Sequence, residues 1–256
     1  MQQQATGTAS PENAGEAFWI ADDKIRLLAD DAVFFPTDFG RNMGLLLREK
    51  LSSGERVCEL GLGTGVLAVL AGLKGARVVG LDKNPSAVAL SRRNWELNGL
   101  PGDGADFRPS DLFSGIADAE LGTFDAVWSN PPLLPDIASR PDDQAEREAF
   151  EIAGPLGRLV LDAMLSKSQD LLKPGGRMYT IATSIQGWER TRALLDEHWH
   201  TWEVVTEVDL ELTSECGPVY IEWWKQQQSA TGETYLYEEN GRITHKLWFI
   251  EALKSG

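Results

Sequence analysis

The sequence has few of the residues that hold metals or disulfides, and no long apolar run. Its 256 residues include 2 cysteines and 3 histidines. Cys58 and Cys216 lack the paired spacing that is typical of a metal site or a disulfide framework. No stretch approaches the roughly 20 apolar residues that a membrane-spanning helix needs. We therefore expect a reduced, cytoplasmic protein with no metal and no membrane contact, in which Cys58 is a small buried residue.

Cations are also scarce in this chain. It carries 24 Lys and Arg residues against 39 Asp and Glu residues, which gives a net charge of −15. Nucleic-acid binders usually present a basic surface, because phosphate contacts supply much of their affinity. The most basic segment, residues 91–95, lies in a predicted helix and is typical of a solvated face. A nucleic-acid partner is therefore disfavoured, and only a local basic patch would reverse that expectation.

Three regions are expected along the chain. Residues 1–14 lack the basic segment and apolar core of a secretory signal, and we expect them to form a disordered tail. Residues 15–52 are expected to form an N-terminal cap segment, for which the plain alternative is an extra packed layer. Residues 53–256 are expected to form the main domain, with no second core.

Local patterns predict the elements at both ends of the chain. In the cap, we expect a helix over 15–31, a short strand over 31–35, and Asp38 capping a helix over 41–51. In the last third, the patterns predict helices over 159–172 and 188–198, strands over 178–183, 202–212, 219–224 and 243–253, and a loop over 225–232.

A glycine-rich loop follows a predicted strand over residues 56–60. Glycines stand at alternate positions, Gly61, Gly63 and Gly65, and a helix is predicted over 66–73. Glycines adopt positive φ and let a ligand approach the backbone closely. The following helix N-terminus offers free N–H groups and the positive end of its dipole. This loop is therefore a candidate site for a ligand.

A second predicted strand, over residues 76–81, ends at Asp82. An acid at the tip of the neighbouring strand can accept hydrogen bonds from ribose hydroxyls. The glycine loop and Asp82 together predict a nucleoside-containing cofactor. A dinucleotide is a poor match, because the third glycine of the dinucleotide fingerprint would fall on Val66.

The tetrapeptide Ser129-Asn130-Pro131-Pro132 follows an apolar run over residues 124–128, which is typical of a buried strand. Two prolines end the strand and fix the backbone. Asn130 then presents its side-chain oxygen beside main-chain carbonyls, an arrangement of acceptors that suits an –NH2 donor. Asn-Pro-Pro alone is also typical of an ordinary turn, and the glycine loop upstream is what favours a functional role.

The run from Glu59 to Gly65, completed by Asp82, resembles the cofactor motifs of the class I S-adenosylmethionine-dependent methyltransferases. Ser110-Asp111 resembles the acidic position that holds the adenine amino group in that family. Residues 171–179 resemble its helix–turn–strand leading into the fifth strand. The resemblance covers roughly residues 55–185.

This resemblance implies an α/β fold. We expect a Rossmann-like, seven-stranded, mostly parallel sheet with helices on both faces and an N-terminal addition of helix and strand. It implies S-adenosylmethionine as the cofactor. The residues that it assigns to cofactor binding are Glu59, Gly61, Gly63, Gly65, Asp82, Asp111 and Asn130.

Asn130-Pro131-Pro132 resembles the catalytic motif of members that methylate planar or amide nitrogen, including release-factor glutamine N5-methyltransferases and adenine-N6 and guanine-N2 RNA methyltransferases. Residues 152–158 resemble the glutamine branch in particular. That family usually carries an aromatic residue after Asn-Pro-Pro, where this chain has Leu133, which weakens both a stacked base and a straightforward glutamine assignment. The substrate walls implied by the resemblance are Phe34, Phe35, Thr37 and Leu133.

Three functions remain open from the sequence. The leading one is S-adenosylmethionine-dependent N-methylation of an amide or amine nitrogen, on a small molecule or on a protein side chain such as glutamine. The second is N-methylation of an RNA base. The third keeps the cofactor fold without methyl transfer, either to use S-adenosylmethionine in another reaction, such as cyclisation of its aminobutyrate arm, or to serve only as a binding module. The acceptor and the oligomeric state are left open.

Overall fold

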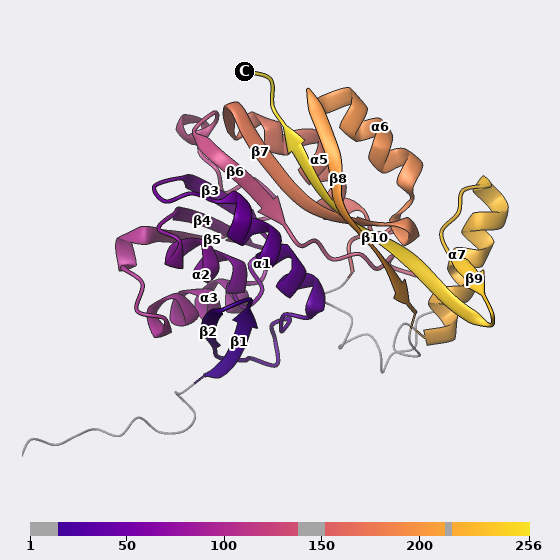
Figure 1. The fold of residues 1–256 in the computed structure, drawn as a ribbon, viewed down its shortest axis with the longest axis horizontal. Coiled ribbons are helices and arrows are strands. Elements are labelled where there is room, and N and C mark those ends of the chain that lie inside the picture. The colour runs from indigo at the N-terminus through magenta and orange to yellow at the C-terminus, as the bar shows by residue number, and fades with distance from the viewer. Residues whose placement is uncertain (1–14, 138–151, 213–216) are drawn as a thin grey trace, which may run out of the picture.

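The computed structural model describes residues 15–137, 152–212 and 217–256 (Figure 1). The tail expected over residues 1–14 and the residue Cys216 lie outside the described part of the chain. Among the described residues, no helix is long and apolar enough to cross a membrane. Within the same ranges, no cluster of three or more His, Cys, Asp or Glu side chains has the geometry to hold a metal ion.

A large twisted sheet forms the centre of the molecule, with its strands in the order β5-β4-β3-β6-β7-β10-β8 (Figure 1). The strands from β5 to β7 are parallel, and β10 runs antiparallel to β7 and β8. The expected seven-stranded, mostly parallel sheet is confirmed, and the short strand β9 adds an eighth by pairing with β10. The strands are β3 Arg56–Leu60, β4 Arg77–Asp82, β5 Ala105–Pro109, β6 Phe124–Ser129, β7 Leu172–Thr183, β8 Thr201–Glu211, β9 Tyr237–Glu239 and β10 Arg242–Leu253.

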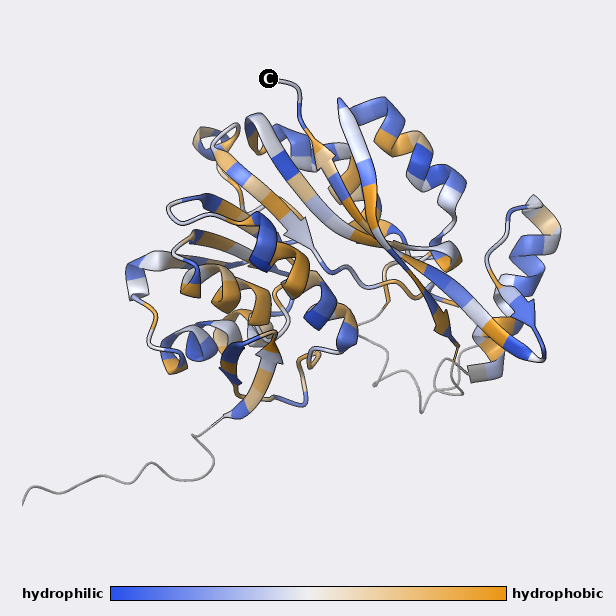
Figure 2. Ribbon diagram, in the orientation of Figure 1, coloured by the Kyte–Doolittle hydropathy of each residue, from blue (hydrophilic) through white to orange (hydrophobic). Residues whose placement is uncertain are grey.

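Helices cover both faces of this sheet, because successive residues of its buried strands point to opposite sides. Val57 of β3 joins the core under one group of helices, whereas Cys58 joins the core under the other. Figure 2 shows that α2 is apolar along its length, as expected for a helix pressed onto the sheet. The first face carries α1 Asp38–Lys50, α2 Val66–Leu73 and α3 Pro85–Leu97, and the second carries α5 Leu159–Lys167 and α6 Trp188–His198.

The helix expected over residues 15–31 is wrong. This segment is an antiparallel hairpin of β1 Glu16–Ile20 and β2 Asp23–Leu27. The apolar residues alternate along each strand, with a period of two, and so bury one face of the hairpin against α1 and α2. The chain reverses at Ala21, whose φ is 49°. The buried positions are Phe18, Ile20, Ile25 and Leu27.

Two other expectations in the cap segment are also wrong. Residues 31–35 form turns and irregular structure instead of a strand. Helix α1 begins at Asp38, with Thr37 at the N-cap, so Asp38 lies in the first turn and does not cap a helix over 41–51. A carboxylate in the first turn is still favourable there, because the helix dipole is positive at that end.

The strand expected over residues 219–224 and the loop expected over 225–232 are wrong, because helix α7, Gly217–Thr231, covers all of these residues except the last. Tyr220 and Trp224 are four residues apart, both fully buried, with ring centroids 5.7 Å apart. The aromatic content favoured a strand, but residues four positions apart lie on the same face of a helix. Helix α5 also ends earlier than expected, at Lys167, and β7 begins at Leu172.

Candidate active site

The loops that follow four neighbouring strands meet at one edge of the sheet. The Gly61 amide donates to the Leu81 carbonyl at 2.8 Å, which joins the ends of β3 and β4. The Ser110 amide donates to the Asp82 carbonyl at 2.8 Å, which joins β4 to β5. On the other side, Ser129 Oγ donates to the Leu60 carbonyl at 2.7 Å, which joins β3 to β6. The structure therefore brings the glycine loop, Asp82, Asp111 and Asn130 to one edge.

The glycine loop has the positive φ angles that its sequence predicts. Gly61, Gly63 and Gly65 have φ values of 84°, 52° and 76°. A Cβ at Gly65 would lie 2.7 Å from the Ser91 side chain, so packing against α3 requires a glycine there. A Cβ at Gly61 would lie no closer than 4.0 Å to any neighbour, the nearest being Ser129 Oγ. Gly61 therefore leaves open space beside the backbone.

Asp82 is half-buried and faces the glycine loop. Its carboxylate accepts hydrogen bonds from the Gly63 amide at 3.0 Å and the Asn84 amide at 2.8 Å. Burial raises the pKa of this carboxyl, against the opposing effect of the backbone donors. A carboxylate has about four acceptor positions, so Asp82 retains capacity for further donors. Asp111 is exposed in the next loop, directly after the buried Ser110.

Glu59 is a buried acid beneath this loop, with 2% of its surface exposed. Burial raises the pKa of its carboxyl to about 8, and the nearby charge of Asp82 acts in the same direction. Its cross-strand neighbour is Trp128. Hydrogen bonding from the Trp128 side chain and the Ala68 backbone opposes the rise in this pKa. The Trp128 contact is poorly aligned, because Glu59 Oε2 and Trp128 Nε1, with Thr64 Oγ1, are buried atoms of the described residues that lack a partner in good hydrogen-bond geometry. Buried polar atoms of this kind are normally satisfied by water or a ligand.

The raised pKa of Glu59 predicts a pH-dependent stability. The folded chain keeps the Glu59 proton up to about pH 8, whereas a glutamate ordinarily releases it near 4.5. Because the folded state then binds more protons than the unfolded state, the free energy of unfolding falls as pH rises between these two values. Glu59→Gln has no such proton and should lose less thermal stability across this window. Melting curves of both proteins at each end of the window test this, and parallel pH dependence would contradict it.

Asn130 is partly buried and directly follows Ser129, the last residue of β6, whose side chain contacts the residue before the glycine loop. A Cβ at Gly40 of α1 would lie 3.9 Å from Asn130 Nδ2, and a Cβ at Gly63 would lie 3.4 Å from the Phe34 carbonyl oxygen. The cap segment therefore reaches both the glycine loop and Asn130. Pro131 is buried and Pro132 is partly buried.

The expected substrate residues lie in different surroundings. The backbone of Phe34 lies beside the glycine loop, whereas Phe35 packs against the core on the α1–α2 face. Thr37 is exposed at the N-cap of α1. Leu133 packs into a separate apolar cluster with α7, around Tyr220 and Trp224. Sequence reasoning missed this role of α7, because its aromatic residues were interpreted as a strand.

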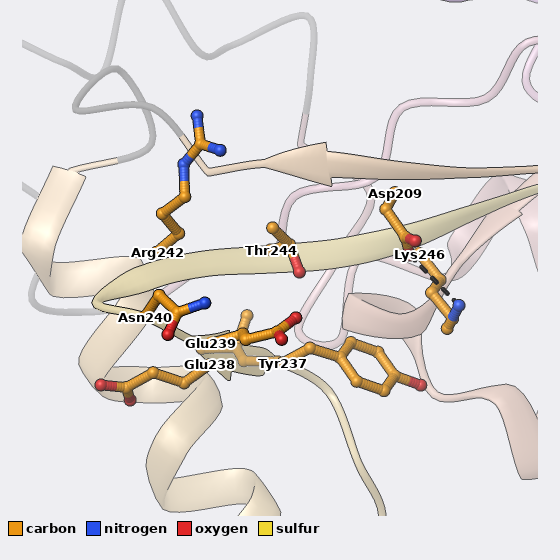
Figure 3. A pocket seen from close by; sticks show the side chains of 9 residues that line it. Asp209, Tyr237, Glu238, Glu239, Asn240, Arg242, Thr244 and Lys246 are labelled. Atoms are coloured by element: carbon orange, nitrogen blue, oxygen red, sulfur yellow. Dashed lines mark hydrogen bonds and ion pairs between the residues drawn. The ribbon is translucent and has the colours of Figure 1, made fainter.

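A groove of about 720 Å³ lies elsewhere, at the far end of β8 and β10 (Figure 3). Within its lining, Lys246 Nζ lies 3.1 Å from Asp209 Oδ1, and it also contacts Glu207 outside the groove. The Lys246 ammonium also lies 5.4 Å from the centre of the Tyr237 ring. None of the motif residues lines this groove.

The chain is similar in sequence to known methyltransferases. The family model described as the methyltransferase small domain matches residues 24–209. A release factor glutamine methyltransferase of Deinococcus radiodurans is 31% identical over 173 residues, covering 64% of this chain and 58% of that protein. The ribosomal RNA small subunit methyltransferase C of Chromohalobacter salexigens is 37% identical over 138 residues, covering 54% of this chain and 34% of that protein. The chain thus spans less than two thirds of the length of either relative.

A solved structure shares the fold. The Mtq2–Trm112 complex of E. cuniculi, responsible for the methylation of the eRF1 translation termination factor, matches with a TM-score of 0.54 at 20% sequence identity. The match covers 88% of this chain and 100% of that chain. At this level of identity the match supports the architecture of the sheet and its helices.

Proposed function

The chain belongs to the methyltransferase small domain family, and on that premise we propose that it transfers a methyl group from S-adenosylmethionine to the amide nitrogen of a protein glutamine side chain. The observation that carries this proposal is the position of Asn130. It stands at the end of β6, beside the glycine loop after β3 and within reach of the cap segment. A planar –NH2 group held at Asn130 would lie next to a cofactor held by the loop.

The residues present fit S-adenosylmethionine. Gly61 leaves open space at the backbone, and Asp82 retains acceptor capacity suited to ribose hydroxyls. The exposed Asp111 carboxylate can accept from an adenine amino group. Glu59 and Thr64 add buried polar groups beneath the same loop. When bound, the cofactor supplies a methyl group activated by a positively charged sulfur.

Asn130 and Pro131 would orient the acceptor nitrogen. The lone pair of an amide nitrogen is delocalised, so the reaction depends on how that nitrogen is presented. If the Asn130 side-chain oxygen and the Pro131 carbonyl each accept one N–H, the nitrogen lone pair is directed away from both, toward the methyl group. Positioning of this kind lowers the activation barrier of a reaction by several kcal/mol.

No strong general base is needed in this scheme, because the proton can leave after the methyl group has been transferred. His245 is buried on β10, where burial lowers its pKa to about 4. His198 ends α6, and His200 lies just before β8. None of the three lies on the loops that carry the motifs. We therefore assign no histidine to the proton transfer.

Charge favours a protein acceptor over RNA. The chain has a net charge of −15, which raises the electrostatic cost of approaching a phosphate backbone. Several arginines are already engaged by acids: Arg56 and Arg108 both contact Glu120, and Arg177 contacts Glu55. The name of the Deinococcus radiodurans relative, which is 31% identical, also points to glutamine in a release factor.

A direct comparison of acceptors tests this proposal. Purified protein is incubated with S-adenosylmethionine that carries a labelled methyl group, and separately offered a peptide-chain release factor, small-subunit ribosomal RNA and free glutamine. We expect label in the release factor, on a glutamine residue located by peptide mass spectrometry. Label in the RNA alone would favour the base-methylating alternative, and label in free glutamine alone would indicate a small-molecule enzyme.

A further inference from the structure

We propose that Arg158 and Gln186 form a positioning bracket that holds the loop after Asn130-Pro131-Pro132, so that turnover depends on them while cofactor binding does not. The inference rests on the proposed function, because it treats Asn130 as the residue that presents the acceptor. Neither side chain belongs to the cofactor motifs. Both come from the segments between β6 and α6.

Arg158 is the one arginine that is buried within the described ranges, with 4% of its surface exposed. Its Nη1 donates to the Gln186 carbonyl, to the Gly187 carbonyl at 2.9 Å and to Thr191 Oγ1 at 3.1 Å. Its Nε donates to Asp162 Oδ1 at 2.9 Å. Its Nη2 makes no hydrogen bond among the described residues, but it lies 2.9 Å from the same carboxylate oxygen as an ion pair. Burying a guanidinium is costly unless its charge and donors are met in this way. Here the donors tie the start of α5 to the turn between β7 and α6.

The Gln186 side chain connects the end of β7 to the segment that packs on the loop after Asn130. It is buried, with 3% of its surface exposed. Its Nε2 donates to the Gly157 carbonyl at 2.6 Å, and its Oε1 accepts from the Thr183 amide at the end of β7, at 3.2 Å. Gly157 lies directly against the Leu133 backbone, since a Cβ at Gly157 would be 2.2 Å from the Leu133 carbonyl oxygen. A contact path therefore runs from the end of β7 to the residue after Asn130-Pro131-Pro132.

Backbone hydrogen bonds fix the next residues of the same loop. The Ala153 amide donates to the Leu134 carbonyl at 2.9 Å, and the Asp136 amide donates to the Gly154 carbonyl at 2.9 Å. These two bonds, with the bridge between Leu134 and Ile152, join residues 133–136 to residues 152–158. If the bracket is loosened, residues 152–158 are no longer held against the end of β7. Residues 133–136, which bond to them, can then shift, and the direction of the Asn130 side chain is no longer fixed.

Arg190 offers a matched control for the bracket. Asp162, which Arg158 contacts, is also paired with the exposed Arg190 through its other oxygen, at 2.6 Å. Among the hydrogen bonds of the described residues, Arg190 bonds to Asp162 and not to residues 152–158 or 184–187. Its loss therefore removes a charge from the same ion pair and leaves the bracket in place.

The test compares Arg158→Lys, Gln186→Met and the control Arg190→Met. Titration calorimetry measures S-adenosylmethionine affinity, a methyl-transfer assay with release factor measures kcat and KM, and hydrogen exchange follows peptides covering 133–137 and 152–158. We expect cofactor affinity within about threefold of the parent and kcat lower by on the order of 100-fold, because a small misplacement of a reacting group has that effect. Amide exchange in the two peptides should rise at least about tenfold when such hydrogen bonds are lost. Arg190→Met should match the parent in all three measurements.

The exchange measurement needs no acceptor, so it separates the two possible failures. If the parent protein methylates no acceptor but exchange rises in the bracket variants alone, the proposed function fails and the bracket remains. If either bracket variant binds cofactor normally and retains parent kcat and parent exchange, the inference is wrong. If Arg158→Lys does not fold, Gln186→Met decides the question, since it removes the side-chain donor to Gly157 and the acceptor for Thr183 and keeps a similar volume.

Discussion

Replacing Asn130 with alanine should lower kcat by about 10²- to 10³-fold, the loss that follows removal of one well-placed polar group from an active site. The substitution removes the side-chain oxygen that orients the acceptor nitrogen. It leaves the glycine loop and Asp82 in place, since their hydrogen bonds do not involve the Asn130 side chain. S-adenosylmethionine affinity should therefore stay within about threefold of the parent value. Steady-state kinetics with release factor and titration calorimetry measure the two effects.

A matched control for Asn130→Ala is Gln226→Ala on the exposed side of α7. Gln226 Nε2 donates only to the exposed Glu222 side chain, at 3.1 Å, among the hydrogen bonds of the described residues. This variant should keep the parent kcat and affinity. Full activity in Asn130→Ala would place the acceptor site elsewhere, and loss of cofactor affinity without loss of kcat would make Asn130 a cofactor ligand instead.

Replacing Asp82 with alanine should weaken S-adenosylmethionine binding by on the order of 100-fold. The ribose would lose two hydrogen bonds to a charged acceptor, each worth about 1.5 kcal/mol or more, and about 1.4 kcal/mol changes an affinity tenfold. The Gly63 and Asn84 amides would also lose their acceptor, which loosens the loop. Titration calorimetry measures the affinity, and a melting curve shows whether the variant is folded.

Asp103→Ala is the matched control for Asp82→Ala, because it removes the same charge from an exposed position before β5, away from the candidate site. Its cofactor affinity should equal that of the parent. The raised pKa of Asp82 also predicts the direction of a pH effect. Since the carboxylate form accepts the ribose hydroxyls, affinity should fall with acid at a pH above the usual aspartate value of 3.8. Unchanged affinity in Asp82→Ala would contradict the cofactor assignment.

The motif region could be predicted from the sequence because local and global signals agree there. The strand over 56–60 and the helix over 66–73 appear with the expected bounds, since buried parallel strands are continuous apolar runs and the glycines mark the turn. The membership in the methyltransferase family that these residues indicated is confirmed by the family match. The contribution of each site residue to catalysis stays a prediction.

The secondary structure was predicted wrongly in the regions where tertiary contacts override local propensity. The hairpin over β1 and β2 depends on α1 and α2 to cover its apolar face, and helix and strand patterns are hard to separate in so short a segment. Helix α7 depends on the cluster that it forms with Leu133 and its neighbours. The bracket of Arg158 and Gln186 joins residues 28 positions apart, which no local pattern reveals.

The most direct test of methyl transfer at this site follows the fate of the cofactor by mass spectrometry. Purified protein is incubated with S-adenosylmethionine alone, and with S-adenosylmethionine and a release factor. We expect the cofactor to stay intact when alone, and the release factor to yield S-adenosylhomocysteine together with one methyl group on a glutamine of that factor. Asn130→Ala should slow the formation of both products by about 10²- to 10³-fold. Conversion of the cofactor alone to methylthioadenosine would contradict the account, because the site would then act on the cofactor itself.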